Sequence, residues 1–184
     1  MTKIGLATIW LDGCSGCHMS LLDIDEHLLE LAEKVELRYS PLVDRKNFPE
    51  EVDITLVEGA VSTTADQEKI RVVRAHSKIL VSLGDCAVTA NVPAMRNRFS
   101  VDEVVRRAYL ENSDAPQPEG KGAGAVSFTG LPRLCRTARP VHEFVPVDLF
   151  LPGCPPPSAA ILYLLSELLA GRIPDMREQS RFGA

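Results

Sequence analysis

The stretch Lys3–Leu11, KIGLATIWL, is an almost unbroken run of apolar residues. Such a run predicts a β-strand that is buried on both faces, which is typical of a parallel sheet. Two cysteines, Cys14 and Cys17, follow the strand after a short turn. Apolar residues then recur at helical spacing from His18 to Lys34. The chain therefore begins with a strand, a turn that carries thiols, and a helix.

Four further apolar runs predict strands, and helical patterns separate most of them. The predicted strands are Val35–Leu42, Asp53–Val57, Lys78–Leu83 and Val145–Leu151. The later predicted helices are Thr64–His76, Val101–Leu110 and Ser158–Ala170. Strands that alternate with helices lie parallel, because each crossover returns the chain to the same end of the sheet. We therefore expect an α/β fold with a flavodoxin-like, doubly wound parallel sheet.

The segment Glu111–Glu143 is rich in glycine and proline and too long for an ordinary connection. We expect it to form an irregular insert before the last strand of a single domain that covers residues 1–184. From Lys121 to His142 it contains four Lys or Arg side chains and no acidic side chain. It is either a solvated loop or a docking surface for a partner protein.

The composition is that of a soluble globular protein, with 45% apolar and 24% charged residues among 184. A net charge of -5 argues against nucleic acid as the partner. The apolar runs are shorter than the roughly 20 residues that span a membrane, and the start shows no signal-peptide pattern. We expect a cytoplasmic protein that does not contact the membrane. In that compartment, cysteines that act together bind metals or catalyse reactions more often than they form disulfides.

Four of the five cysteines each lie just after a predicted strand, at Cys14, Cys17, Cys86 and Cys154. The carboxyl ends of parallel strands share one edge of the sheet, so we expect these four thiols to meet there. Four converging thiolates are typical ligands of a metal ion or an iron–sulfur cluster. Cys135 follows no predicted strand, and we interpret it as a free thiol.

The spacing of the cysteines favours one occupant of this site and leaves two alternatives. Zinc ribbons pair two C-x-x-C motifs, whereas this chain has one, so the scattered set suits a [4Fe–4S] cluster better than structural zinc. A C-x-x-C that opens a helix is also typical of thiol–disulfide oxidoreductases, which would use Cys14 and Cys17. In that case the helix N-terminus is expected to lower the thiol pKa.

Glycines and one carboxylate accompany the cysteines. Gly13, Gly16 and Gly153 allow the backbone to come close to a bound cluster, and their N–H groups are candidate donors to its sulfur atoms. Glu58 ends the third predicted strand, at the edge that carries the thiols. It is either a proton relay or a carboxylate that is hydrogen-bonded to a loop backbone.

Four motifs resemble, in the same order, those of the small subunit of cytoplasmic [NiFe] hydrogenases. They are WLDGCSGCHMSLLD at 10–23, VEGAV at 57–61, GDCA at 84–87 and LPGCPP at 151–156. No cysteine follows Cys154, and this resembles the branch found in soluble, NAD-reducing hydrogenases. The cluster-bearing subunit of respiratory complex I has the same fold but adjacent cysteines in its first motif. A complex I-like quinone oxidoreductase subunit is therefore the alternative.

The resemblance implies that Cys14, Cys17, Cys86 and Cys154 hold one [4Fe–4S] cluster. That cluster would pass electrons between the Ni–Fe centre of a large subunit and diaphorase subunits, which carry FMN, further iron–sulfur clusters and the NAD site. The chain would then be part of a hydrogen:NAD+ oxidoreductase but not catalytic alone. We expect no flavin on this chain, because the C-x-x-C occupies the place where a flavodoxin binds FMN phosphate.

Overall fold

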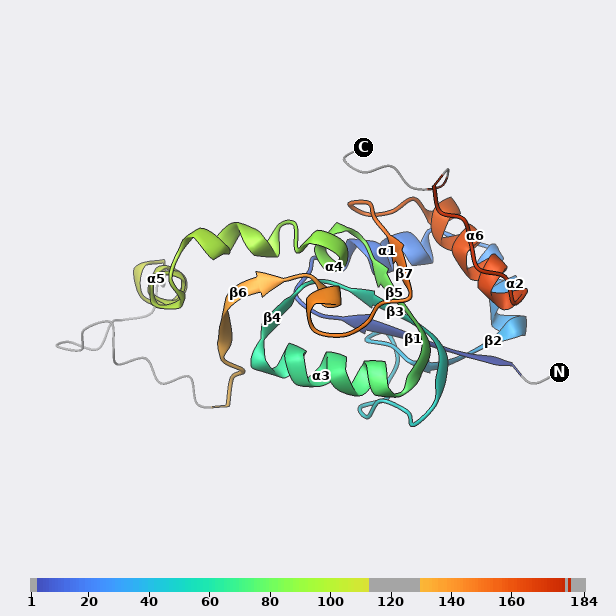
Figure 1. Cartoon of the computed structure of the whole chain (residues 1–184), viewed down its shortest axis with the longest axis horizontal. Helices are drawn as coiled ribbons and strands as arrows, with labels where there is room; N and C mark the ends of the chain where they lie inside the picture. The colour runs from blue at the N-terminus through green and yellow to red at the C-terminus, as the bar shows by residue number, and fades with distance from the viewer. Residues whose placement is uncertain (1–2, 113–129, 178, 180–184) are drawn as a thin grey trace.

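Five parallel strands form the central sheet, in the order β2-β1-β3-β5-β7 (Figure 1). The structure is a computed structural model that describes residues 3–112, 130–177 and 179. The strands are β1 (Ile4–Trp10), β2 (Val35–Tyr39), β3 (Val52–Glu58), β5 (Ser77–Leu83) and β7 (Leu149–Leu151). This order is that of flavodoxin-like sheets, so the predicted fold class is confirmed.

Helices cover both faces of the central sheet (Figure 1). One face carries α3 (Thr64–Ala75), and the other carries α1 (Gly16–Leu22), α2 (His27–Lys34) and α6 (Ser158–Leu169). Along β3, Leu56 packs with α6, whereas the next residue, Val57, packs with α3. Successive side chains of a strand point to opposite faces, so a sheet covered on both sides needs apolar residues at every position.

The helix predicted from His18 to Lys34 is two helices, α1 and α2, with a break at residues 23–26. At the break Asp25 has a φ of 55°, in the left-handed region that Asp tolerates better than most residues. The change of direction places Ile24 in the core, where it is 4% exposed. The apolar period continues across the break, so periodicity alone did not reveal it.

The last strand is shorter than predicted, because β7 begins only at Leu149. Pro146 has no N–H group to contribute to a strand ladder. At Asp148 the side chain replaces a main-chain acceptor, since Asp148 Oδ2 accepts the Leu80 N–H at 2.8 Å. Asp148 also donates its N–H to the Leu80 carbonyl at 3.0 Å, so the chain is bonded to β5 at this one residue before the strand begins.

A second sheet pairs β4 (Val61–Thr63) with β6 (Leu134–Arg139), antiparallel, and neither strand was predicted. Because β6 lies within the predicted insert, that segment is not irregular throughout; Lys121 lies outside the described residues. The other edge of β6 is satisfied by side chains. Asn97 exchanges two hydrogen bonds with the Ala138 main chain, at 2.8 and 2.7 Å. Because a distant side chain supplies these hydrogen bonds, the sequence of β6 itself does not indicate a strand.

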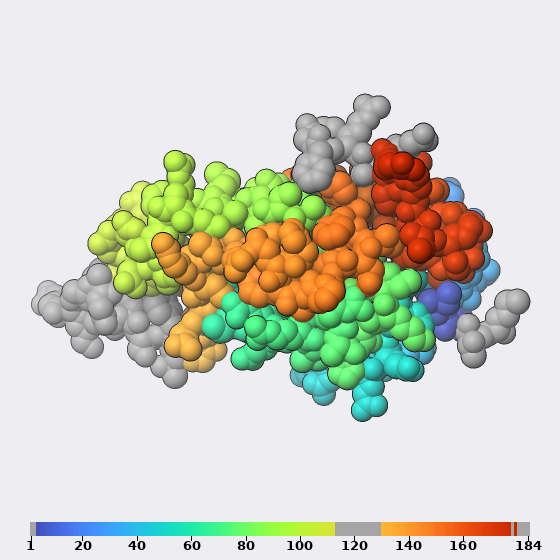
Figure 2. Space-filling view, in the orientation of Figure 1, coloured from blue at the N-terminus to red at the C-terminus, as the bar shows by residue number. Residues whose placement is uncertain are grey.

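Short helices lie between β5 and β6 in the chain and directly after β6. They are α4 (Asp85–Thr89), η1 (Pro93–Arg98), α5 (Val101–Arg106), its π-helical continuation η2 (Arg107–Glu111), and η4 (Val141–Glu143). Figure 2 shows that α5, in yellow-green, and part of β6, in orange, form one end of the molecule. Within the described residues, every helix is too short or too polar to cross a membrane.

Candidate functional site

The four predicted cysteines all lie beyond the carboxyl ends of parallel strands. Cys14 occupies the turn between β1 and α1, and Cys17 lies in the first turn of α1. Cys86 is the second residue of α4, directly after β5, and Cys154 follows β7. Three loops therefore bring the four thiols to the same edge of the sheet, and we call this set the cysteine site.

Hydrogen bonds hold two of these loops together. The Gly84 N–H donates to the Leu151 carbonyl at 2.8 Å, and the Asp85 N–H donates to the Gly153 carbonyl at 2.9 Å. In return, the Gly153 N–H donates to Asp85 Oδ1 at 2.7 Å. The loop of Cys86 is thus fixed against the loop of Cys154.

The third loop is joined to the same group through α1. The Ser20 hydroxyl, buried in α1, donates to the Pro156 carbonyl at 2.6 Å, two residues beyond Cys154. Asp12, which precedes Cys14 in the loop after β1, exchanges two main-chain hydrogen bonds with Ala60, which follows β3, at 3.0 and 2.8 Å. The loops after β1, β3 and β7 are therefore connected.

The four thiols are close enough to influence one another electrostatically. Burial raises the pKa of Cys17 far above its ordinary value, and the charges of Glu58, Cys86, Cys14 and Cys154 raise it further. Burial also raises the pKa of Cys86, with smaller contributions in the same direction from Cys154, Cys14 and Glu58. A set of thiolates under mutual repulsion is stabilised by bound metal cations, which displace the thiol protons.

A close approach between Gly84 and Cys17 shapes the buried side of the site. A Cβ atom at Gly84 would lie 2.2 Å from Cys17 Sγ, so the sulfur occupies the space that a side chain would need. Gly84 also has φ 81° and ψ 162°, a conformation that is almost restricted to glycine. In the sequence Gly84 lies two residues before Cys86, whereas the space it leaves is used by Cys17.

The three glycines predicted around the cluster differ in what their amides do. The Gly16 N–H donates to Cys14 Sγ at 3.4 Å. The Gly153 N–H donates to Asp85 Oδ1, as described above, and its predicted role as a donor to sulfur stays a prediction. At Gly13 the carbonyl accepts the indole N–H of Trp10 at 3.1 Å, and the predicted role of its amide stays a prediction.

Glu58 is buried at the end of β3, with 2% of its surface exposed, and pairs with His18 of α1. Glu58 Oε2 accepts the His18 backbone N–H at 2.9 Å and lies 2.5 Å from His18 Nδ1. The carboxylate therefore binds the main chain of the first turn of α1, next to Cys17. The backbone partner of Glu58 thus belongs to a helix and not to a loop as expected, while the proton relay stays a prediction.

Replacing Glu58 by Ala is expected to lower the free energy of unfolding by about 1–3 kcal/mol, since it leaves buried donors without an acceptor. Glu58→Gln is the matched control, because its amide oxygen can still accept the His18 N–H. Urea denaturation of both variants measures the difference. Equal stability of the two variants would contradict the role in fixing α1, and full hydrogen turnover by Glu58→Gln would end the proton-relay hypothesis.

The donor set fits an iron–sulfur cluster in its chemistry. Two thiols of the site are exposed, Cys86 is half-buried and Cys17 is buried. Among the residues that the structure describes, no three His, Cys, Asp or Glu side chains are grouped as ligands of a single metal ion. A four-iron cube keeps its cysteine sulfurs further apart than a zinc ion with Zn–S bonds of about 2.3 Å does, so ligands of a cube do not need that tight grouping.

The two cysteines of the C-x-x-C motif differ in exposure, because Cys14 is exposed and Cys17 is buried. A reactive thiol has a lowered pKa and is partly exposed, whereas Cys17 is buried and its pKa is raised. The predicted lowering by the helix N-terminus is therefore outweighed by burial. Cys135 lies apart, in β6, where its sulfur accepts a hydrogen bond from Gln67 Nε2 at 3.0 Å.

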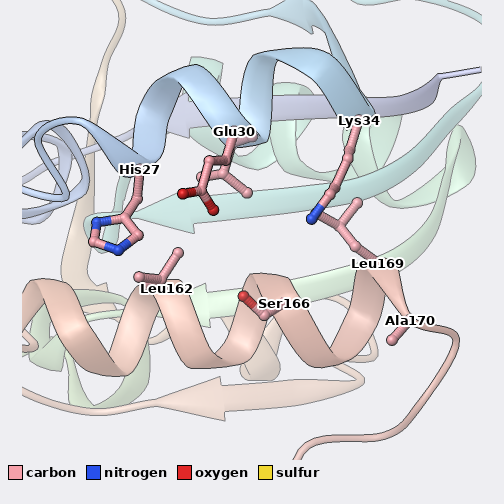
Figure 3. Close-up of a pocket in the computed structure, with 8 residues that line it drawn as sticks. His27, Glu30, Lys34, Leu162, Ser166, Leu169 and Ala170 are labelled. Atoms are coloured by element: carbon pink, nitrogen blue, oxygen red, sulfur yellow. The ribbon is translucent and has the colours of Figure 1, made fainter.

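A groove of about 240 Å³ lies between α2 and α6, and no cysteine lines it. Figure 3 shows His27, Glu30 and Lys34 of α2 facing Leu162 and Ser166 of α6 across this groove. Its lining combines both charges with aliphatic side chains and has no thiol. The cysteine site is thus formed by loops at the sheet edge and is separate from this groove.

Comparison with known proteins gives a consistent result. A family model described as the 20 kDa subunit of NADH ubiquinone oxidoreductase matches residues 14–168. The delta subunit of the NAD-reducing hydrogenase HoxS from Cupriavidus necator is 44% identical over 170 residues, which are 92% of this chain and 80% of that relative. The F420-non-reducing hydrogenase of Methanothermobacter marburgensis has a subunit that is 34% identical over 92% of this chain, which spans about half (54%) of that relative.

A similar fold occurs in solved structures. In the crystal structure of an NAD+-reducing [NiFe]-hydrogenase in the H2-reduced state, one chain superposes with a TM-score of 0.90 at 39% identity. The superposition covers 98% of this chain and 99% of that one. A chain of a [NiFeSe]-hydrogenase superposes with a TM-score of 0.53 at 19% identity, and this likeness concerns the fold alone.

Proposed function

Since this chain belongs to the family of the 20 kDa subunit of NADH ubiquinone oxidoreductase, which includes the small subunits of NAD-reducing [NiFe] hydrogenases, we propose that it transfers electrons in such a hydrogenase. Its ligands to a single [4Fe–4S] cluster would be Cys14, Cys17, Cys86 and Cys154. The observation that carries the proposal is the convergence of these four thiols, from three separate loops, at one edge of the sheet.

A bound [4Fe–4S] cluster supplies one-electron transfer. The residues of this chain hold, shield and orient it. Cys17 and Cys86 approach from the buried side, and Gly84 gives the Cys17 sulfur the space it needs. The exposed thiols Cys14 and Cys154 lie on the side toward solvent, where a partner subunit would cover them. The loops that carry the ligands are tied by hydrogen bonds, so the site is largely preorganised.

Exposed apolar side chains next to the cysteine loops support a large partner subunit. Trp10 is 46% exposed and contacts the Cys14 loop, and Met19 is 56% exposed two residues after Cys17. Apolar side chains gathered around a functional edge are typical of a protein interface. We propose that the large subunit with the Ni–Fe centre covers this edge.

In this proposal, electrons pass from the cluster to diaphorase subunits that hold FMN, further iron–sulfur clusters and the NAD site. The basic segment around β6 offers Arg133 and Arg136, both exposed, as a docking surface for a protein partner. The chain by itself would be silent in catalysis, since it provides a relay and no hydrogen-binding metal. We expect the complex to work in the cytoplasm.

Co-purification tests the proposal. An affinity tag on this chain, used without oxygen, is expected to retrieve a large subunit that contains nickel, and the retrieved complex should reduce NAD+ with hydrogen. The family description favours one alternative, a subunit of a quinone-reducing complex. A retrieved complex that lacks nickel and reduces quinone would contradict the proposal and support that alternative.

A further inference from the structure

The turn before α1 contains a backbone conformation that helix formation does not explain. Ser15 occupies the N-cap position of α1 with φ 66° and ψ 7°, in the left-handed region. An N-cap residue is ordinarily extended, and a serine there accepts a hydrogen bond from an amide of the first helical turn. Ser15 does neither, because its side chain makes no such capping bond and its hydroxyl donates to the Cys14 carbonyl at 2.6 Å.

Ser15 also differs from the other left-handed residues that are not glycine. Among the residues that the structure describes, these are Asp25 and Ala90, and both lie at or shortly after the end of a helix. There the left-handed conformation commonly serves to satisfy the last carbonyl groups. Ser15 instead precedes a helix and lies inside the C-x-x-C motif. A conformation that is costly for a residue with a side chain is typical of functional sites.

The left-handed turn directs one amide at a sulfur of the cysteine site. The Gly16 N–H donates to Cys14 Sγ at 3.4 Å. A left-handed residue beside a helical one turns the backbone N–H groups toward a common anionic acceptor. A Cβ atom at Gly16 would lie 3.2 Å from Cys14 Sγ, so the missing side chain allows this approach. The amide of His18 has a different use, since it donates to Glu58.

We infer that the Gly16 amide, held against Cys14 by the turn at Ser15, raises the reduction potential of the cluster at the cysteine site. Ser15 and Gly16 are then positioning residues for electron transfer, and the inference rests on the proposed function. Reduction adds one electron, which hydrogen supplies in that function, and increases the negative charge on the ligand sulfurs. An N–H that points at such a sulfur keeps its proton and stabilises the reduced state more than the oxidised state.

The exposure of Cys14 determines where this effect is best measured. In the isolated chain Cys14 is exposed, so water competes with the Gly16 amide for its sulfur. A partner subunit that covers Cys14 excludes this water, and a hydrogen bond is stronger in surroundings of low dielectric constant. We therefore expect the full effect in the assembled complex.

An exchange of amide for ester at Gly16 tests the inference. Replacement of Gly16 by glycolic acid removes the N–H, adds no side chain and leaves φ free. The same exchange at Gly171, whose N–H donates to the Leu168 carbonyl at 3.0 Å, is the matched control. The purified complex is titrated electrochemically while the EPR signal of this cluster, identified by its absence in a Cys17→Ser complex, is followed. We expect a more negative midpoint for the Gly16 ester and the parent midpoint for the Gly171 ester.

Two variants of Ser15 test the turn itself. Ser15→Gly retains the left-handed conformation without the hydroxyl, and we expect it to keep the parent midpoint. Ser15→Val disfavours that conformation, because a β-branched residue rarely adopts a positive φ. We expect its midpoint to shift in the same direction as that of the Gly16 ester. Where Ser15→Val does not retain its cluster, the ester variant decides.

The outcomes that would overturn the inference are distinct from a failure of the proposed function. An unchanged midpoint in the Gly16 ester would overturn it, and so would loss of the cluster from that ester, since the amide would then hold the cluster rather than tune it. An unchanged midpoint in a cluster-containing Ser15→Val complex would overturn the role of the turn. A parent complex with no cluster signal from this chain would instead overturn the proposed function.

Discussion

The Cys17→Ser variant will lose its iron–sulfur cluster and the hydrogen-dependent reduction of NAD+, whereas the Cys135→Ser variant will keep both. Both changes replace one sulfur by one oxygen. Cys17 is buried and is electrostatically coupled to Cys14, Cys86 and Cys154. Cys135 lies in β6, and its sulfur accepts a hydrogen bond from Gln67. The effect therefore depends on position and not on the chemistry of the exchange.

Iron and acid-labile sulfide per chain, together with visible absorption, measure this effect in protein purified without oxygen. Far-ultraviolet circular dichroism shows whether the Cys17→Ser chain retains its secondary structure. Undiminished iron in the Cys17→Ser variant would contradict the assignment. So would loss of the cluster from Cys135→Ser.

A second large effect is expected from Gly84→Ala. The backbone conformation at Gly84 is nearly restricted to glycine, which costs an alanine about 1–3 kcal/mol. The added Cβ would also lie 2.2 Å from Cys17 Sγ, an overlap that costs about 1–3 kcal/mol more if the chain adjusts. Because the flexible neighbour is the ligand itself, the adjustment displaces the Cys17 sulfur from the cluster. We expect a less stable protein with little bound iron.

Gly171→Ala provides the matched control for Gly84→Ala. Gly171 has φ 72° after the end of α6, and a Cβ there would meet no atom within 4 Å. It thus imposes a positive-φ strain of about 1–2 kcal/mol without the overlap. We expect Gly171→Ala to lower the free energy of unfolding in urea and to keep its full iron content. Equal iron content in the two variants would show that the contact between Gly84 and Cys17 does not determine cluster binding.

The sequence was sufficient to predict the central sheet and the position of four cysteines after its strands, since both follow from long-range regularities. Buried parallel strands such as β3 are apolar at every position, and parallel connections place every carboxyl end at one edge. The cysteines lie at that edge because they follow these strands in the chain. Local conformation was harder to predict. The break at Asp25 and the irregular course before Leu149 depend on single side chains that replace regular backbone interactions.

What was missed in the site has a common physical cause. The contact between Gly84 and Cys17 joins residues 67 positions apart (84 − 17 = 67). The bond between Glu58 and His18 likewise spans two elements. Such contacts depend on how β3, β5 and α1 pack at the carboxyl edge. The motif GDCA at 84–87 contains Gly84 but does not indicate which sulfur this glycine accommodates.

Mössbauer spectroscopy of this chain, labelled with ⁵⁷Fe and prepared without oxygen, tests the central claim most directly. The account predicts the spectrum of one [4Fe–4S] cluster, with about four iron and four sulfide per chain, in the parent and in Cys135→Ser but in none of the variants with Ser at position 14, 17, 86 or 154. Bound zinc in place of iron, or an iron-free chain from an intact complex, would contradict it.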